Sequence, residues 1–162
     1  MITTKKINEL QFKKKPRSLS RLVALQILFQ NNYSPRISFL EKFIDDFIKN
    51  YFINEELNSF DLTNLVDKKF ILELITGHQQ NQENYDVEIS ALLKNSLQLK
   101  NIDNLELDLI RLACFEFTNF PQTPKKVIIS EYVDIAGCFF TDKKINFING
   151  ILVALEEKFR KA

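Results

Sequence analysis

The sequence is poor in the residues that build tight turns. Of its 162 residues, three are glycine and four are proline. All-β sandwiches and barrels need many turns, whereas long helices joined by short loops need few. The composition therefore predicts an all-α fold. The absence of a glycine-rich loop also excludes the nucleotide-binding folds that cradle phosphates on such a loop.

Residues that bind metals or cross-link the chain are equally scarce. Two cysteines and one histidine are too few for a structural zinc site of four cysteine and histidine ligands, or for a disulfide scaffold. We expect His78 to cap a helix end or lie at the surface, Cys114 to be buried and Cys138 to be partly exposed. No residue pattern indicates an active site, so we predict a protein that is not an enzyme and has no cofactor or metal.

Long apolar runs are also missing. No run approaches the roughly 18 residues of a membrane-spanning helix, and the first fifteen residues lack the apolar segment of a secretory signal. We therefore expect a cytoplasmic protein with reduced thiols and no membrane partner.

Charge is distributed unevenly along the chain. Residues 1–21 contain seven basic residues and one acidic residue, whereas the remainder contains fifteen basic and twenty acidic residues. A basic segment on an acidic body is typical of contact with nucleic acid or a membrane surface, or of a solvated tail. Few apolar residues precede Leu19, which disfavours the membrane. We expect residues 1–15 to form a flexible basic arm and residues 16–162 to form a single helical domain.

Hydrophobic periodicity predicts a compact bundle of six or seven helices. The expected helices cover residues 21–32, 38–52, 64–78, 89–97, 105–118 and 124–139, followed by a last helix that Thr141 or Asp142 caps. Gly77 is expected to stop or kink the third helix. Thr123 and Pro124 are expected to be the N-cap and first residue of the sixth. The helix over 105–118 is apolar on most faces, which places it at the centre of the bundle.

One aromatic residue departs from the apolar stripe of the last helix. The stripe consists of Ile145, Ile148, Leu152, Leu155 and Phe159. Phe147 lies roughly 120° from the centre of this stripe, because each helical residue turns about 100°. Lys143 and Lys144 lie one turn earlier and Gly150 one turn later. An aromatic ring beside lysines is typical of single-stranded RNA binding. The alternative is that Phe147 packs on a neighbouring helix, with Gly150 permitting close approach.

Four strings carry a resemblance to a known family. They are RLVALQILFQ (residues 21–30), RLACFEF (111–117), PKKVIISEYVDIA (124–136) and NFINGIL (146–152). In order and spacing these strings are similar to motifs of the NusB family of bacterial transcription antitermination factors. The resemblance runs from about residue 17 to the end of the chain. The last string is the most specific, and residues 33–100 match only in pattern and length.

The resemblance implies two small helical subdomains packed as one unit, without catalysis. NusB proteins bind boxA, a short single-stranded RNA element of ribosomal RNA transcripts, together with the ribosomal protein NusE. They then join the elongating RNA polymerase with other Nus factors. The family's RNA surface combines the basic N-terminal segment with the start of the last helix, where this sequence places its own basic residues and Phe147. The RNA-binding residues expected here are Lys13, Lys14, Lys15, Arg17, Arg21, Lys143, Lys144 and Phe147.

One partner contact is carried over from the family. Glu106 is expected to contact NusE, the alternative being a solvated carboxylate at the start of a helix. Lys143 and Lys144 stand where the family has an acidic residue followed by serine or threonine. This exchange predicts weaker base discrimination and a stronger salt dependence.

Two other functions and a second oligomeric state remain open at this point. One function is a helical protein-interaction module with weakened or lost RNA specificity. The other is an accessory module, since some ribosomal RNA cytosine methyltransferases carry a similar helical domain; this chain has no Rossmann segment and is not expected to be such an enzyme. Family members are monomers or dimers, so a homodimer is an alternative to a monomer.

Overall fold

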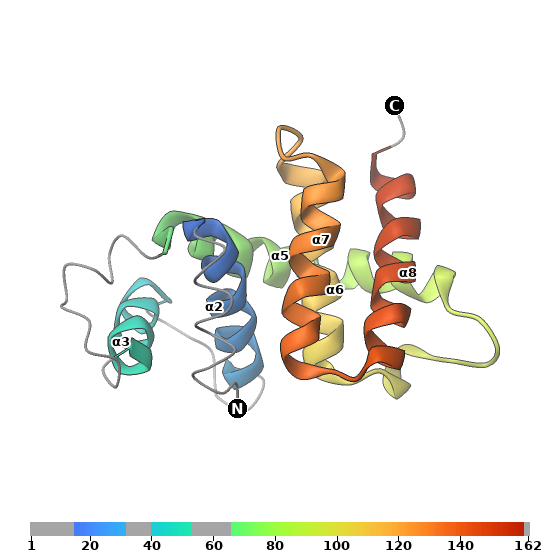
Figure 1. Ribbon diagram of the computed structural model, residues 1–162, viewed down its shortest axis with the longest axis horizontal. Helices are drawn as coiled ribbons and strands as arrows, with labels where there is room; N and C mark the ends of the chain where they lie inside the picture. Colours follow the sequence, from blue (N-terminus) through green and yellow to red (C-terminus); the bar gives the residue numbers. More distant parts are fainter. Residues whose placement is uncertain (1–14, 32–39, 53–65, 161–162) are drawn as a thin grey trace. The chain divides into compact units, whose positions relative to one another are not determined.

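The computed structural model describes residues 15–31, 40–52 and 66–160, and all regular elements in these ranges are helices (Figure 1). The elements are α2 (Pro16–Asn31), α3 (Leu40–Phe52), α5 (Lys68–Leu92), the 3₁₀ helix η1 (Leu99–Asn101), α6 (Asn104–Asn119), α7 (Lys125–Phe139) and α8 (Asp142–Phe159). The all-α class predicted from the scarcity of glycine and proline is confirmed. The predicted basic arm lies outside these ranges except for Lys15.

The chain divides into two compact units, Met1–Ile75 and Thr76–Ala162. In the first unit, α2 packs against α3 and against the start of α5. Ser20 joins two of these elements, because its hydroxyl donates to the Pro16 carbonyl at 2.6 Å and accepts the Asp67 N–H at 2.7 Å. The two helical subdomains that the family resemblance implied are thus present.

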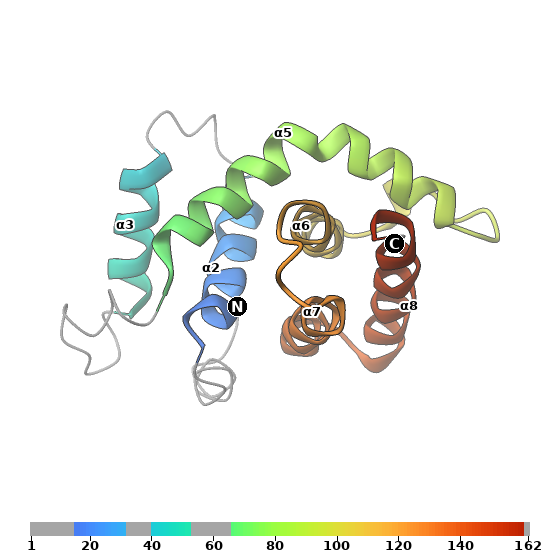
Figure 2. The same cartoon turned by 90° about the horizontal axis from the view of Figure 1, so that it is seen from above.

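In the second unit, α6, α7 and α8 lie side by side, with α7 antiparallel to its two neighbours (Figures 1 and 2). The part of α5 that begins at Thr76 runs crosswise over α6 and α8 (Figure 2). Every residue of α6 from Glu106 to Phe117 is buried. The central position predicted for this helix from its apolar composition is therefore confirmed.

Helix α5 corrects the predicted boundary near His78. It is one continuous helix of 25 residues, with Gly77 in its interior. A Cβ atom at Gly77 would lie 2.0 Å from the ring of Phe115 on α6. Gly77 therefore permits α5 and α6 to approach closely and does not end the helix. The separate helix predicted over 89–97 is the final part of α5 and the turn that follows it.

His78 is neither the helix cap nor the surface residue that the sequence predicts, because it lies inside α5 and is buried. Its side chain is 3% exposed, and Nε2 lies 2.9 Å from Oδ1 of Asp108. The same carboxylate accepts a hydrogen bond from Arg111 at 3.1 Å, and Arg111 also donates to both oxygens of Asp86 at 2.7 and 2.9 Å. The polar sequence around His78 suggested solvent exposure, but the helix turns this one position towards α6. The resulting hydrogen-bonded network joins α5 to α6.

Other local predictions are confirmed or shifted slightly. Helix α8 begins at Asp142 after Thr141, as expected, whereas α7 begins at Lys125 with Pro124 as its N-cap, one residue later than expected. Cys114 is fully buried, which raises the pKa of its thiol, and Cys138 is half-buried. Within the described ranges, no helix combines the length and hydrophobicity that a membrane crossing requires.

Candidate nucleic-acid interface

The first two turns of α8 carry three of the predicted RNA-binding residues. Lys143 is exposed, and Lys144 and Phe147 are half-buried. The next residue, Ile148, is fully buried and fixes the helix to the core. Because adjacent residues on a helix point about 100° apart, the ring of Phe147 is held at the edge of the core.

Phe147 forms one wall of a groove of about 400 Å³. The other lining residues belong to the end of α5 and to the turn after it: Leu92, Leu93, Lys94, Asn95 and Leu97. The alternative role of Gly150, close approach to a neighbouring helix, is wrong, because a Cβ atom there would meet nothing within 4 Å. Phe147 thus lines a groove together with a neighbouring element and leaves part of its surface to solvent.

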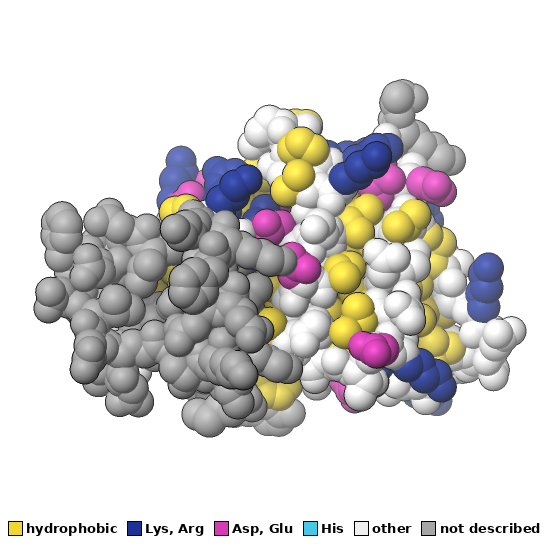
Figure 3. Space-filling view, viewed as in Figure 1, with side chains coloured by type: hydrophobic (Ala, Val, Ile, Leu, Met, Phe, Trp, Pro, Cys, Tyr) yellow, Lys and Arg dark blue, Asp and Glu magenta, His cyan; other side chains and the backbone are white. Residues whose placement is uncertain are grey.

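Lys144 belongs to a cluster of opposite charges at the start of α8. Its ammonium group pairs with the carboxylate of Asp103 and lies 3.7 Å from Glu106. The hydrogen bond to Asp103 is the main reason that the pKa of Lys144 is raised. Figure 3 shows basic and acidic side chains next to each other where α8 begins. Lys144 therefore remains charged, but much of its charge is compensated within the protein.

The alternative in which Glu106 is a solvated carboxylate is wrong. Glu106 is 4% exposed, and this burial raises its pKa, while the nearby Lys144 ammonium opposes the increase. Its neighbour Asp103 is far more open, with 62% of its side chain exposed. Lys144, which is predicted to contact RNA, and Glu106, which is predicted to contact the partner, thus belong to one cluster at the starts of α6 and α8.

The basic residues of α2 form a second set, in the first unit. The guanidinium carbons of Arg17 and Arg21 lie 4.7 and 5.3 Å from the centre of the Phe70 ring. Arg21 is 3% exposed, whereas Lys15 and Arg17 are exposed, and Arg17 lies 3.6 Å from the Asp67 carboxylate. Arg21 is therefore buried beside Phe70, and the exposed cations of this set are Lys15 and Arg17. The predicted contacts Lys13 and Lys14 lie outside the described residues.

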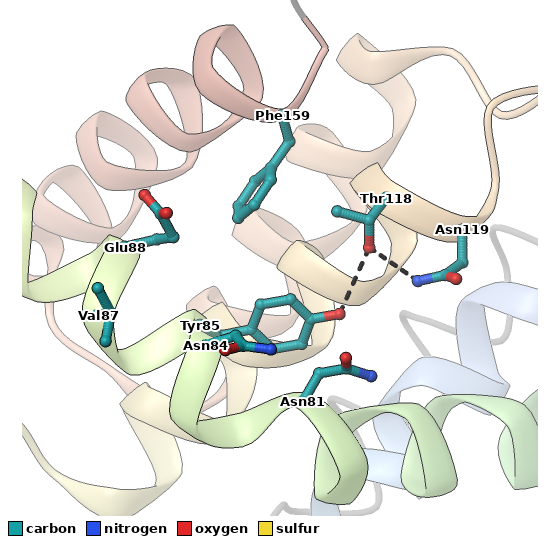
Figure 4. A pocket seen from close by; sticks show the side chains of 8 residues that line it. All are labelled: Asn81, Asn84, Tyr85, Val87, Glu88, Thr118, Asn119 and Phe159. Atoms are coloured by element: carbon teal, nitrogen blue, oxygen red, sulfur yellow. Dashed lines mark hydrogen bonds between the residues drawn. The ribbon is translucent and has the colours of Figure 1, made fainter.

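A second cavity, of about 410 Å³, lies between α5 and the C-terminal ends of α6 and α8 (Figure 4). Its lining residues are Asn81, Asn84, Tyr85, Val87, Glu88, Thr118, Asn119 and Phe159. The Tyr85 hydroxyl lies 3.4 Å from that of Thr118, and the Tyr85 ring meets Phe159 edge-on. No described lysine or arginine lines this cavity, and its one acidic lining residue, Glu88, forms an ion pair with Lys158. Its chemistry therefore does not suit phosphate, unlike that of the groove at Phe147.

The sequence profile of the NusB family matches residues 18–157. The chain belongs to the NusB family. The transcription antitermination protein NusB of Gluconobacter oxydans is 31% identical over 147 residues, which cover 90% of this chain and 89% of that protein. NusB of Caldicellulosiruptor saccharolyticus is 33% identical over 135 residues, which cover 82% of this chain and 94% of that protein. The solved structure of T. maritima NusB matches with a TM-score of 0.68 at 26% identity, covering 90% of this chain and 93% of that one.

The NusB motif at the start of α8 has surroundings that were not predicted from the sequence. Local sequence patterns indicate neither the ion pair of Lys144 with Asp103 nor the groove that Phe147 shares with the Lys94–Leu97 turn. The string KNSL does signal a turn, because asparagine and serine favour turn conformations. Nothing local, however, indicates that this turn lines the same groove as Phe147.

Proposed function

We propose that this NusB-family chain is a transcription antitermination factor that binds boxA RNA together with NusE and joins the elongating RNA polymerase with other Nus factors. The family assignment over residues 18–157 supports the general role, since the relatives that cover most of the chain bear that name. The proposed action is binding alone, with no chemical step.

The observation that carries the RNA proposal is the position of Phe147. Its ring is half-buried, lines a groove and lies one helical turn after the exposed Lys143. An unstacked base would pack on this ring while Lys143 neutralises the adjacent phosphate. Ile148 keeps the ring at this position by holding the other face of α8 in the core.

The exposed cations Lys15 and Arg17 are proposed to contact further phosphates of the same RNA. Phe70 stacks with the guanidinium of Arg17 at 4.7 Å, which restricts the motion of that side chain. A restricted side chain loses less entropy on binding than a free one. Lys13 and Lys14 are proposed to add further cations, as in the basic segment of the family.

The start of α6 is proposed to contact NusE. Asp103 presents an exposed carboxylate, and Glu106 lies behind it, held close to Lys144. An exposed acidic group next to a buried one suits a basic patch on a partner, with the exposed group giving most of the long-range attraction.

A salt titration tests the phosphate contact of Lys143. For single-stranded RNA, removing one phosphate contact reduces the slope of log K against log salt by about 0.7. We expect Lys143→Ala to show this loss with boxA RNA. Lys126→Ala, which removes an exposed lysine from the start of α7, is the matched control and should keep the wild-type slope. Equal losses in both variants would indicate nonspecific attraction to the whole basic surface.

A protein-interaction module with weakened RNA specificity is the second candidate function. The compensation of Lys144 by Asp103 and Glu106 favours it, because one of the two lysines before Phe147 is engaged within the protein. This candidate predicts that the chain binds NusE but binds boxA and scrambled RNA equally well.

A further inference from the structure

The groove beside Phe147 is lined mainly by apolar side chains. Besides the aromatic ring, its lining includes the half-buried Leu92 and Leu93 and the more open Leu97, which is 36% exposed. The volume of about 400 Å³ falls at the lower end of the range for small-ligand sites. A nucleobase is flat and has two faces, so one face stacked on Phe147 leaves the other for the leucine side chains that line the same groove.

The turn that carries Leu97 has a defined backbone. Asn95 and Ser96 have φ values of 56° and 61°, and the N–H of Leu97 donates to the carbonyl of Lys94 at 3.2 Å. Two successive residues with positive φ inside a four-residue hydrogen-bonded turn have the geometry of a type I′ turn. Such a turn brings its first and last residues together. The ammonium of Lys94 and the apolar side chain of Leu97 are therefore presented from one short segment.

The charge around the groove favours a polyanion as its occupant. Lys94 lines it and Lys143 lies one turn before Phe147, and both are exposed. Among the described lining residues there is no aspartate or glutamate. The carboxamide of Asn95 adds a group that can donate to and accept from a base edge. Each nucleotide of single-stranded RNA brings one base and one phosphate, which matches an apolar groove with exposed lysines at or near it.

We propose that the Lys94–Leu97 turn is a second RNA-contacting element, in which Leu97 covers the base that stacks on Phe147 and Lys94 binds a neighbouring phosphate. This inference rests on the proposed function, because it names further residues of the same site. It assigns to the segment after α5 a role that the family motifs at the start of α8 do not include.

Two substitutions separate the two contacts. With a boxA-like single-stranded RNA, Lys94→Ala should reduce the salt slope by about 0.7. Leu97→Ala should weaken binding by about fivefold at every salt concentration, the lower end of the range for one stacked base, and leave the slope unchanged. Lys100→Ala removes an exposed lysine of η1 that does not line the groove, and it should behave as the wild type.

A double-mutant cycle tests whether Leu97 and Phe147 contact the same base. If they do, the combined Phe147→Ala and Leu97→Ala variant should lose less affinity than the product of the two single losses. Leu97→Met keeps the wall apolar and should bind as the wild type. Thermal melting of each variant shows whether a loss of affinity reflects loss of fold.

Three other outcomes would contradict the proposal, and they can be told apart. Wild-type affinity and slope in both Lys94→Ala and Leu97→Ala, with weakened binding in Phe147→Ala, would overturn the inference and leave the proposed function intact. Failure of the unmodified chain to bind any RNA would overturn both. A change in oligomeric state on Leu97→Ala, with RNA affinity unchanged, would show that the groove joins copies of the chain instead.

Discussion

At the scale of single residues, the proposed binding residue Phe147 lies next to the core residue Ile148 at the start of α8. Ile148 is fully buried and Phe147 is half-buried, although both are large and apolar. The periodicity of the sequence predicted this difference, because Ile148 belongs to the apolar stripe and Phe147 does not. It could not predict the groove, because Leu92 and Leu97 lie far from Phe147 in sequence.

Truncating Phe147 and truncating Ile148 should therefore affect two different quantities, RNA affinity and stability. Phe147→Ala should weaken RNA binding by about 1–3 kcal/mol, because one stacked base is lost. Ile148→Ala should lower the free energy of unfolding by about 2–5 kcal/mol, as for other large-to-small changes in a core. Fluorescence anisotropy with RNA and urea unfolding measure the two quantities. Unchanged RNA affinity in Phe147→Ala, together with a large loss of stability, would assign this ring to the core alone.

The buried carboxyl of Glu106 predicts a pH dependence of stability. Burial raises its pKa above 4.5, so the folded protein holds this proton more tightly than the unfolded chain. The contribution is therefore fully present below pH 4.5 and is lost as the pH rises through the folded-state pKa. Glu106→Gln should remove this decline from the pH profile of the unfolding free energy. Glu157→Gln, at an exposed position of α8, is the control, and identical profiles for Glu106→Gln and the wild type would contradict the prediction.

At the scale of elements, tertiary contacts decide boundaries that local signals do not. Gly77 and the polar residues after it are typical of a helix end, yet α5 continues to Leu92 because Phe115 and the buried Arg111 pack against it. The end of α6 also depends on a distant residue. Arg160 donates to the carbonyls of Phe117, Phe120 and Thr123 at distances of 3.0, 2.6 and 2.6 Å. No sequence pattern near residue 119 predicts this cap.

The two glycines inside helices provide a matched test of this account. Gly77→Ala would place a methyl group against the Phe115 ring and should lower the free energy of unfolding by about 1–3 kcal/mol, as overpacked core substitutions do. Gly150→Ala meets nothing within 4 Å and should raise it by roughly 0.5–1 kcal/mol, the usual gain of alanine over glycine in a helix. Urea unfolding measures the free energy of unfolding of both variants. Equal effects of the same sign at the two positions would contradict the role assigned to Gly77.

At the scale of the whole molecule, composition and periodicity predicted the all-α class, the buried centre at α6 and the stripe of α8. These features depend on the average burial of whole helix faces, which hydrophobic periodicity predicts well. The four family strings predicted the NusB assignment. The ion pairs of Lys144, the buried position of His78 and the groove at Phe147 could not be predicted, because each depends on which distant side chain lies opposite.

The central claim is that this NusB-family chain recognises boxA RNA with the help of NusE. The most direct measurement is fluorescence anisotropy of labelled boxA RNA and of a scrambled RNA of equal length and composition, each with and without NusE. We predict tighter binding to boxA than to the scrambled RNA, with the difference increased by NusE. Equal affinity for the two RNAs, both with and without NusE, would contradict the claim.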